Sequence, residues 1–358
     1  MTNTAKNIIV PNKPGIFRTV FLYVGQGDSS LLVIPDGSDY RFMLIDSHRE
    51  NSAGGIDLLK LLKDLLGEDG KPLDYYVNTH PHTDHLGLVK EIHEEIGINQ
   101  IWDSGHKPGG DHKASYDDFA GVIKNVGADN VFKMKGSRED NKLDDKEIHL
   151  GQINFNVLAP AEYVADEIAD EKPDARHARI HEHCSVLRFK YGRDERQILI
   201  TGDADYAAWA KHIADYHKER LSATVLRAAH HGSNSFFWEG SDTSIDPYLE
   251  HLKLIDPKYV IVSAPKRKES KHEHPDKEAM ELYGKYVPST QLFHLGDKRI
   301  CAIVDIDESG DINVYPDEDL VNNYPVDSGE DSSGEREASN SMAPMTVCAK
   351  LDNKPMGD

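Results

Sequence analysis

Residues 78–87 read Asn-Thr-His-Pro-His-Thr-Asp-His-Leu-Gly, and this stretch decides the fold. Its four residues of metal-binding type lie within six positions: His80, His82, Asp84 and His85. Neutral imidazole and carboxylate groups are protein ligands of zinc, manganese and iron. The apolar segment 73–77 predicts a buried strand before the stretch, and Asp84 suits the N-cap of a helix after it. The pattern His-x-His-x-Asp-His therefore predicts a metal site between the end of a strand and the start of a helix.

This pattern resembles the signature of the metallo-β-lactamase fold. The resemblance implies an α/β protein, an αββα sandwich that usually holds two metal ions in the cleft between its sheets. A second stretch, Phe21-Leu22-Tyr23-Val24-Gly25-Gln26-Gly27-Asp28-Ser29, resembles the opening motif of the hydrolase domain of the competence protein ComEC. It is also similar to the opening of bacterial phosphorylcholine esterase domains.

Composition limits the class of protein. The chain has 358 residues, enough for one large domain or two, and a net charge of −21. This charge argues against a protein that coats duplex DNA with a basic surface, although bound metals bring positive charge of their own. The three cysteines are far apart and predict no disulfide framework. No apolar run has the length of a signal sequence or membrane span, so we expect a soluble cytoplasmic protein with no membrane contact.

The chain divides into three parts by composition. Residues 1–15 are predicted to form an N-terminal arm, and residues 16–316 the hydrolase domain. From residue 317 to 358, Ser, Gly, Asp, Glu and Pro dominate with little periodicity. This composition predicts a disordered acidic tail, which would be the contact for a protein partner.

The resemblance implies further metal ligands later in the chain. The family's third histidine is expected in the segment His181-Glu182-His183, directly before a strand. We predict that His183 is this ligand, with His181 as the alternative. Asp203 follows a buried strand and matches the bridging aspartate of the family. A carboxylate between two cations holds them a few ångströms apart, as a two-metal hydrolase requires.

The segment His230-His231-Gly232-Ser233 resembles the last ligand motif of the family. Consecutive side chains on extended backbone point in opposite directions, so one histidine is expected to bind metal and the other to contact substrate. We assign His230 to metal and His231 to substrate, and the reverse assignment stays open. Ser233 and Asn234 are expected to donate hydrogen bonds to phosphate oxygens.

The positions of four other residues predict their roles. His274 precedes Pro275 and, by resemblance, faces the cleft, where it would protonate a leaving alkoxide. Asp28 in the opening motif and Asp46 after the third expected strand are predicted to support the site from behind its ligands. His106 is expected in a loop near the mouth of the cleft, without a functional role.

These residues together predict a metal-dependent hydrolase. The first ion is assigned to His80, His82 and His183, the second to Asp84, His85 and His230, with Asp203 between them. The ions, zinc in preference to manganese, would lower the pKa of a bound water and supply hydroxide for in-line attack on phosphorus. Asp84 would orient that water, while His231 and His274 would act on the substrate.

The resemblance to ComEC-like and phosphorylcholine-esterase-like domains favours a phosphodiester substrate, so the expected enzyme is a phosphodiesterase or nuclease acting on a nucleotide or nucleic acid. Fold alone does not determine function, and two other interpretations stay open. The chain could hydrolyse a non-phosphate ester or an amide. It could also be a metal-stabilised interaction module in a multiprotein complex.

Overall fold

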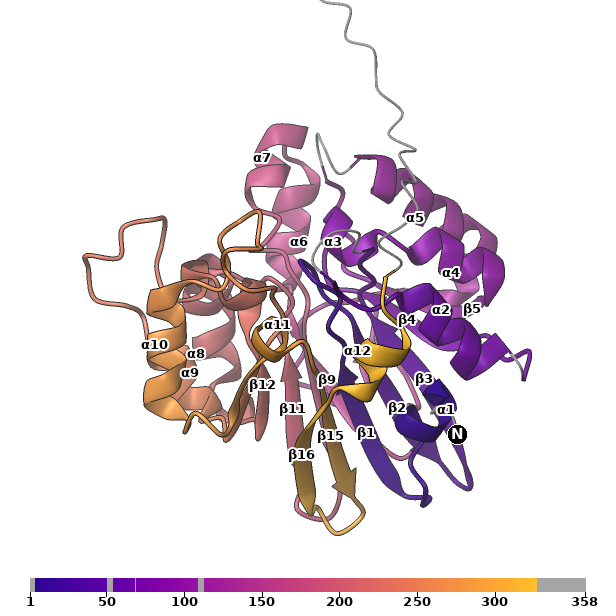
Figure 1. Ribbon diagram of the computed structural model, residues 1–358. Helices are drawn as coiled ribbons and strands as arrows, with labels where there is room; N and C mark the ends of the chain where they lie inside the picture. The colour runs from indigo at the N-terminus through magenta and orange to yellow at the C-terminus, as the bar shows by residue number, and fades with distance from the viewer. Residues whose placement is uncertain (1–3, 50–53, 68, 109–112, 327–358) are drawn as a thin grey trace, which may run out of the picture. The chain divides into compact units, whose positions relative to one another are not determined.

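The computed structural model describes residues 4–49, 54–67, 69–108 and 113–326 (Figure 1). The segment 327–358, most of the expected acidic tail, lies outside the described residues. Among the residues described, no helix is both long enough and apolar enough to span a membrane.

The first sheet has eight strands. In spatial order they are β16 (Ile312–Asp317), β15 (Cys301–Asp307), β1 (Ile16–Phe21), β2 (Ser30–Asp36), β3 (Asp39–Ile45), β4 (Leu73–Asn78), β5 (Ile98–Asp103) and β6 (Val131–Lys133). Strands β16 to β3 pair antiparallel, and β3 to β6 pair parallel. Parallel neighbours need crossover connections, and here helices provide them. The carboxyl ends of β3, β4 and β5 therefore meet at one edge of the sheet.

The second sheet has six strands. In spatial order they are β14 (Leu292–His294), β13 (Tyr259–Val262), β12 (Val225–Arg227), β11 (Arg196–Ile200), β10 (Val186–Tyr191) and β9 (Asn154–Ala159). Strands β11 to β14 are parallel, so their carboxyl ends also share one edge. A separate short hairpin joins β7 (Lys142–Leu143) to β8 (Lys146–Glu147).

Helices cover the outer face of each sheet (Figure 1). On the first sheet these are α2 (Leu58–Leu62), which continues as the π-helix Lys63–Gly67, α4 (Val89–Glu95) and α5 (Lys113–Val126). On the second sheet they are the π-helix η4 (Ala208–Ile213), α8 (Ala214–His217), α9 (Glu250–Ile255) and α10 (Lys277–Tyr286). Helices α6 (Glu162–Ala169) and α7 (Pro173–Ala178) lie in the chain between β9 and β10. Two sheets between helical layers confirm the αββα sandwich predicted from the sequence.

The inner faces of the two sheets pack on each other through aromatic rings. Phe17 of β1 lies 6.1 Å from Tyr191 of β10, and Trp102 of β5 lies 4.7 Å from Phe155 of β9, measured between ring centroids. A second apolar cluster, which includes Trp209, fills the space between the second sheet and its helices. These two cores hold the strand ends at which the candidate site forms.

The compact unit runs to Val326, ten residues past the boundary expected from composition. Helix α12 (Asp319–Asn323) buries Leu320 completely, and the expected N-terminal arm contains α1 (Ala5–Ile9). The hydroxyl of Tyr324 accepts a hydrogen bond of 2.6 Å from the backbone N–H of Ala5. Apolar side chains thus tie both flanking segments to the domain.

Candidate metal centre

The candidate site forms where strand ends from the two sheets meet. The motif 78–87 follows β4, and Asp203 follows β11. The histidine pair 230–231 follows β12, and His181 lies just before β10. Ligand sites in open α/β sheets characteristically lie at such carboxyl ends. Helix α3 (Thr83–Leu86) begins two residues earlier than expected, so His82 occupies its N-cap and Asp84 its first turn.

One carboxylate oxygen, Oδ2 of Asp203, lies at the centre of the site. Four imidazole Nε2 atoms surround it, at 3.3 Å from His85, 3.5 Å from His231 and 3.7 Å from both His80 and His230. The other oxygen, Oδ1, is buried and accepts no hydrogen bond from any residue within the described ranges. Asp203 therefore has the position of a carboxylate shared between two groups of ligands.

The side chains that can hold a metal form two groups, and Asp203 belongs to both. The first consists of His80, His82, His181 and Asp203; the second consists of Asp28, His85, Asp203 and His231. Within each group, one ligand atom from every residue lies within 4.8 Å of the others. The chain thus has two adjacent candidate sites, consistent with a binuclear centre.

The distances fit divalent cations. Two ligands that lie about 2.0–2.1 Å from one tetrahedral ion are separated by about 3.4 Å. The separations of 3.3 to 3.7 Å between Asp203 and the imidazole nitrogens are close to this value. Histidine and carboxylate together suit zinc, manganese or iron, so the residues present fit the two ions that the sequence pattern predicts.

Hydrogen bonds to Nδ1 fix two of the histidine rings. Nδ1 of His85 lies 2.7 Å from Oδ2 of Asp46, and Nδ1 of His231 lies 3.0 Å from the backbone carbonyl oxygen of Ser263. Each ring donates its Nδ1 proton to an oxygen, which leaves the Nε2 lone pair directed at the centre. Asp46 also accepts hydrogen bonds from the backbone N–H and hydroxyl of Thr79, at 2.8 and 2.6 Å.

Asp84 and Asp28 approach His231 from opposite sides. Oδ2 of Asp84 lies 3.4 Å from Nε2 of His231, on the side of the centre. Asp28 lies on the Nδ1 side of both rings, 4.0 Å from His85 and 3.8 Å from His231, and pairs with the guanidinium of Arg227. Since Asp28 already has a buried cationic partner, Asp84 is better placed to bind an ion.

Arg227 was not predicted from the sequence. Its side chain is 1% exposed, and it also donates a hydrogen bond of 2.8 Å to the carbonyl oxygen of Gly202. A signal was present, because Arg227 is the only charged residue in the otherwise apolar strand segment 223–229. A cation in such a strand requires a buried anionic partner, and that partner is Asp28.

Burial and neighbouring charges shift the pKa values of the cluster. Burial holds the pKa of His80 well below its usual range and lowers that of His181 to about 3, so both rings are neutral at pH 7. Burial also acts to lower the pKa of His85, but the surrounding carboxylates, Asp203 first, outweigh it and raise that pKa. Burial acts to raise the pKa of Asp203, but the neighbouring histidines outweigh it and hold that pKa well below its usual range. Without an ion, the centre therefore combines an ionised Asp203 with the neutral imidazoles of His80 and His181, and a bound cation would replace the second proton of His85.

The structure brings the alternative histidine, His181, into the first group. Its ring lies 4.9 Å from His82 and 5.4 Å from His80. His183, the residue preferred from the sequence, belongs to neither group among the described residues. Its ring instead lies 5.1 Å from that of His106. Both residues lie in a turn rather than a strand, so the two-residue spacing does not determine which one faces the centre.

The structure also places His231, rather than His230, in the second group. The sequence argument assumed extended backbone, but both residues have left-handed conformations, with φ of 48° for His230 and 55° for His231. His230 is the more exposed of the two, with 20% of its side chain accessible, and its Nδ1 lies 2.8 Å from the hydroxyl of Ser235. The ring of His230 thus lies beside Asp203 on the open side of the site.

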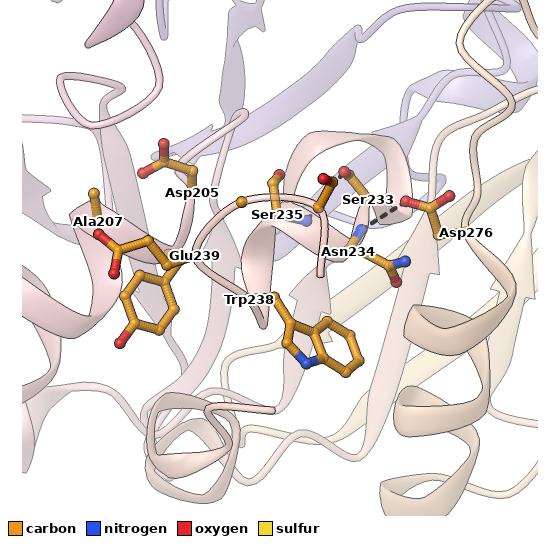
Figure 2. Close-up of a pocket in the computed structure, with 11 residues that line it drawn as sticks. Asp205, Ala207, Ser233, Asn234, Ser235, Trp238, Glu239 and Asp276 are labelled. Atoms are coloured by element: carbon orange, nitrogen blue, oxygen red, sulfur yellow. Dashed lines mark hydrogen bonds between the residues drawn. The ribbon is translucent and has the colours of Figure 1, made fainter. Parts of the chain in front are cut away.

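Ser233 and Asn234 lie beside a cavity of about 420 Å³ (Figure 2). Their polar groups already have partners within the protein. Ser233 Oγ accepts a hydrogen bond from the backbone N–H of Ser235, and the backbone N–H of Asn234 donates to Asp276 at 2.8 Å (Figure 2). The side-chain oxygen of Asn234 accepts a hydrogen bond from Ala279 in the first turn of α10. These contacts hold the loop that carries His230 and His231.

His274 lies on the same side as His230, with 5.3 Å between their ring centroids. Its Nδ1 is 3.7 Å from Oδ2 of Asp276. Helix α10 begins at Lys277, two residues after Pro275, and Asp276 is its N-cap residue. The structure therefore brings His274 next to His230, at the edge of the candidate metal centre.

A mixed two-sheet sandwich with histidines and aspartates at its strand ends defines a class of metal-binding α/β proteins. The sequence profile of the Metallo-beta-lactamase superfamily matches residues 22–210, more than half of the chain. The chain therefore belongs to the metallo-β-lactamase superfamily. No curated protein sequence is significantly similar to it.

Several solved structures are similar to part of this chain. One is CmlA, a diiron β-hydroxylase from Streptomyces venezuelae: identity is 15%, the match covers 77% of this chain and 51% of CmlA, and the TM-score is 0.43. Another is Igni18, a metallo hydrolase from Ignicoccus hospitalis: identity is 16%, coverage 83% and 98%, and the TM-score again 0.43. A third is the metallo-β-lactamase MIM-1 from Novosphingobium pentaromativorans: identity is 18%, coverage 60% and 76%, and the TM-score 0.31. The chain spans about half the length of CmlA.

Proposed function

We propose that this protein is a binuclear metal-dependent hydrolase of phosphodiesters. The observation that carries the proposal is the position of Asp203, whose Oδ2 lies within 3.7 Å of Nε2 atoms from both candidate sites. A carboxylate shared in this way places two ions close enough to act on one phosphate group.

The first ion is assigned to His80, His82, His181 and Asp203, and the second to Asp84, His85, His231 and Asp203. This assignment replaces His183 by His181 and His230 by His231, and its support is that His181 and His231 belong to the two groups of neighbouring ligand atoms. Bound divalent ions lower the pKa of water and stabilise charge on phosphoryl oxygens.

Two residues near the centre are proposed to handle the substrate. His230 is neutral at pH 7, because burial lowers its pKa to about 3, and its ring lies beside the shared carboxylate on the open side. His274 lies next to it and pairs with Asp276. We assign His230 to a contact with a phosphate oxygen and His274 to protonation of the leaving alkoxide.

The phosphodiester preference rests on the resemblance of the opening motif 21–29 to ComEC-like and phosphorylcholine-esterase-like domains. The net charge of −21 favours a small phosphodiester over long duplex DNA, because polyanions repel each other. Arg267 belongs to the basic segment 266–268 and lies 3.9 Å from Asp276, so one cation of that segment is close to His274.

The test combines metal analysis with turnover of bis-p-nitrophenyl phosphate in added zinc or manganese. The wild-type protein is expected to bind two ions in the shared centre and to turn over the substrate. Asp203→Asn should lose metal and activity together. Asp205→Asn is the matched control, because that carboxylate belongs to neither ligand group among the described residues and accepts hydrogen bonds from the backbone, that of Ala208 at 3.1 Å. Activity in a metal-free Asp203→Asn protein would refute the proposal.

The other outcomes separate the alternatives. Bound metal without phosphodiester turnover would favour a non-phosphate ester or an amide as substrate. A chain that binds metal but hydrolyses no ester or amide would favour the metal-stabilised interaction module, and a chain that binds no metal would refute the binuclear centre. Steep loss of DNA affinity with added salt would restore the nuclease interpretation, since phosphate contacts release counterions.

A further inference from the structure

Two buried histidines lie next to each other outside the binuclear centre. His106 belongs to the loop after β5, and His183 to the turn before β10. Each is 2% exposed, and their ring centroids are 5.1 Å apart with an interplanar angle of 46°. Neither belongs to the two groups of four ligands. The proposed hydrolytic mechanism therefore gives them no role.

These two rings have unsatisfied nitrogen atoms. Neither nitrogen of His106 has a hydrogen-bond partner among the residues that the structure describes, and the same is true of Nδ1 of His183. A buried polar atom without a partner costs free energy, so each such atom in a native protein calls for an explanation.

A third histidine shows that unsatisfied nitrogens alone do not make a site. His251 is fully buried, and within the described ranges neither ring nitrogen makes a hydrogen bond of good geometry, although the backbone of Phe236 is close enough to raise the pKa of the ring. Its neighbours are aromatic: the ring of Phe236 lies 4.0 Å away, and that of Tyr248 is stacked at 4.9 Å. His251 therefore packs as an aromatic ring, whereas His106 faces a second imidazole that also has an unused nitrogen.

We propose that His106 and His183 form a third divalent-metal site, separate from the binuclear centre and selective for ions that prefer imidazole, such as zinc. A zinc–nitrogen distance of about 2.0–2.1 Å places a ring centroid roughly 3.2 Å from the ion. Two such rings on a tetrahedral ion have centroids about 5.2 Å apart. The observed separation of 5.1 Å agrees with this geometry.

The charge state of His106 supports the same conclusion. Burial lowers its pKa to about 3, and the neighbouring His183 adds to this effect. The ring is therefore neutral at pH 7 and offers a lone pair to a cation. With two protein ligands, the third site is weaker than either half of the binuclear centre, and water completes its coordination.

The turn 181–183 then serves two sites at once. His181 faces the shared carboxylate, and His183 faces His106 on the other side. The inference does not depend on the hydrolase activity, because it concerns the number of ions that the chain binds. Its failure would leave the proposed function unchanged.

The test is a titration of metal content with zinc buffered over a range of free concentrations. Each sample of the full chain is freed of unbound metal and measured by elemental analysis. The wild-type chain should hold two ions at low free zinc and a third at higher free zinc. His106→Gln and His183→Gln should each keep two ions and lose the third, while His251→Gln should keep all three. Circular dichroism and thermal melting exclude variants that fail to fold.

Three results would overturn the proposal. The wild-type chain could saturate at two ions. The third ion could persist in both His106→Gln and His183→Gln, which would place it elsewhere on the surface. His183→Gln could fall below two ions at low free zinc, which would make His183 a ligand of the binuclear centre. The absorption of bound Co²⁺ gives an independent readout. The spectrum of the wild type minus that of His106→Gln should contain only the bands of the third ion.

Discussion

Replacing Asp46 by Asn should weaken the binding of one metal ion without unfolding the protein. Asp46 holds Thr79 by two hydrogen bonds and accepts from Nδ1 of His85 at 2.7 Å. Asparagine has the same shape, but it is uncharged and has an amide group in place of one carboxylate oxygen. The backbone of Asp46 has a φ of 58°, a conformation that asparagine also adopts readily. The fold should therefore survive the change.

The expected size of the effect comes from the position of Asp46 behind His85. Removal of a group that orients a metal-binding histidine typically lowers metal affinity by about 10- to 100-fold. This corresponds to about 1.4 to 2.7 kcal/mol of binding free energy. The loss of affinity should affect the ion that His85 binds, because Asp46 accepts a hydrogen bond from His85. Among the described residues, no ligand of the first group is a hydrogen-bond partner of Asp46.

The assay is competition between the protein and a chromophoric chelator for zinc, which gives the affinity of each ion. Asp74→Asn is the matched control. Its carboxylate lies at the amino end of β4, whereas the candidate site follows the carboxyl end, and it accepts a hydrogen bond of 2.9 Å from the backbone N–H of Phe42. Asp74→Asn should keep both affinities. If Asp46→Asn binds both ions as tightly as the wild type, the proposed orientation of His85 is refuted.

Three further predictions concern residues outside the two groups of ligands. Arg179 contacts Glu182 at 2.7 Å and Glu171 at 2.6 Å, close in the chain to His181. Lysine cannot form this forked contact, so Arg179→Lys should lower the affinity for the first ion by about tenfold in the same chelator assay. An unchanged affinity would exclude this positioning role. Burial lowers the pKa of His251 to about 3, so on acidification the unfolded chain binds a proton that the folded chain does not. Other buried histidines with lowered pKa values, such as His106 and His217, add to the same loss of stability. Urea titrations should therefore show that from pH 7 to pH 5 the free energy of unfolding falls by about 2 kcal/mol less in His251→Phe than in the wild type, and an equal fall in both would contradict this. Gly202 has a φ of 49°, and a Cβ there would lie 2.6 Å from Sγ of Cys184, so Gly202→Ala should lower the melting temperature by several degrees; a wild-type melting temperature would contradict the geometry.

The part of the site that the sequence predicted best is the part encoded locally. His80, His82, Asp84 and His85 lie within six residues after a strand, so their mutual arrangement follows from one turn and the start of one helix. Asp203 was equally accessible to prediction, because a buried strand ends three residues before the carboxylate. In both cases the strand end determines where the side chain lies.

The assignments at His181 and His230 depended on backbone geometry that the sequence does not determine. The rule that neighbouring side chains point in opposite directions holds for extended backbone, but residues 230 and 231 both have positive φ. The groups that orient the metal ligands could not be predicted from the sequence either. The carbonyl oxygen of Ser263 orients His231 from a different strand, and the sequence has no local sign of this contact.

The boundaries of the domain were misplaced for a related reason. Composition changes at residue 317, but Leu320 and Tyr324 still contribute apolar surface to the core. A few well-placed apolar side chains are enough to hold a short helix against the domain, even where the average composition is acidic. The apolar spacing of Leu320, Val321 and Tyr324 was the available signal.

The pairing of β1 with β15 has a consequence for biosynthesis. Ile16 pairs with Asp307, so the strand made first obtains its second neighbour only when almost the whole domain has left the ribosome. Until then β1 has an open edge, and open apolar edges invite pairing with other chains. The nascent chain also presents His80, His82, Asp84 and His85 long before His181, Asp203 and His231 are made. Metal captured early would meet an incomplete set of ligands, so orderly loading requires that the ion arrive after translation of the second sheet.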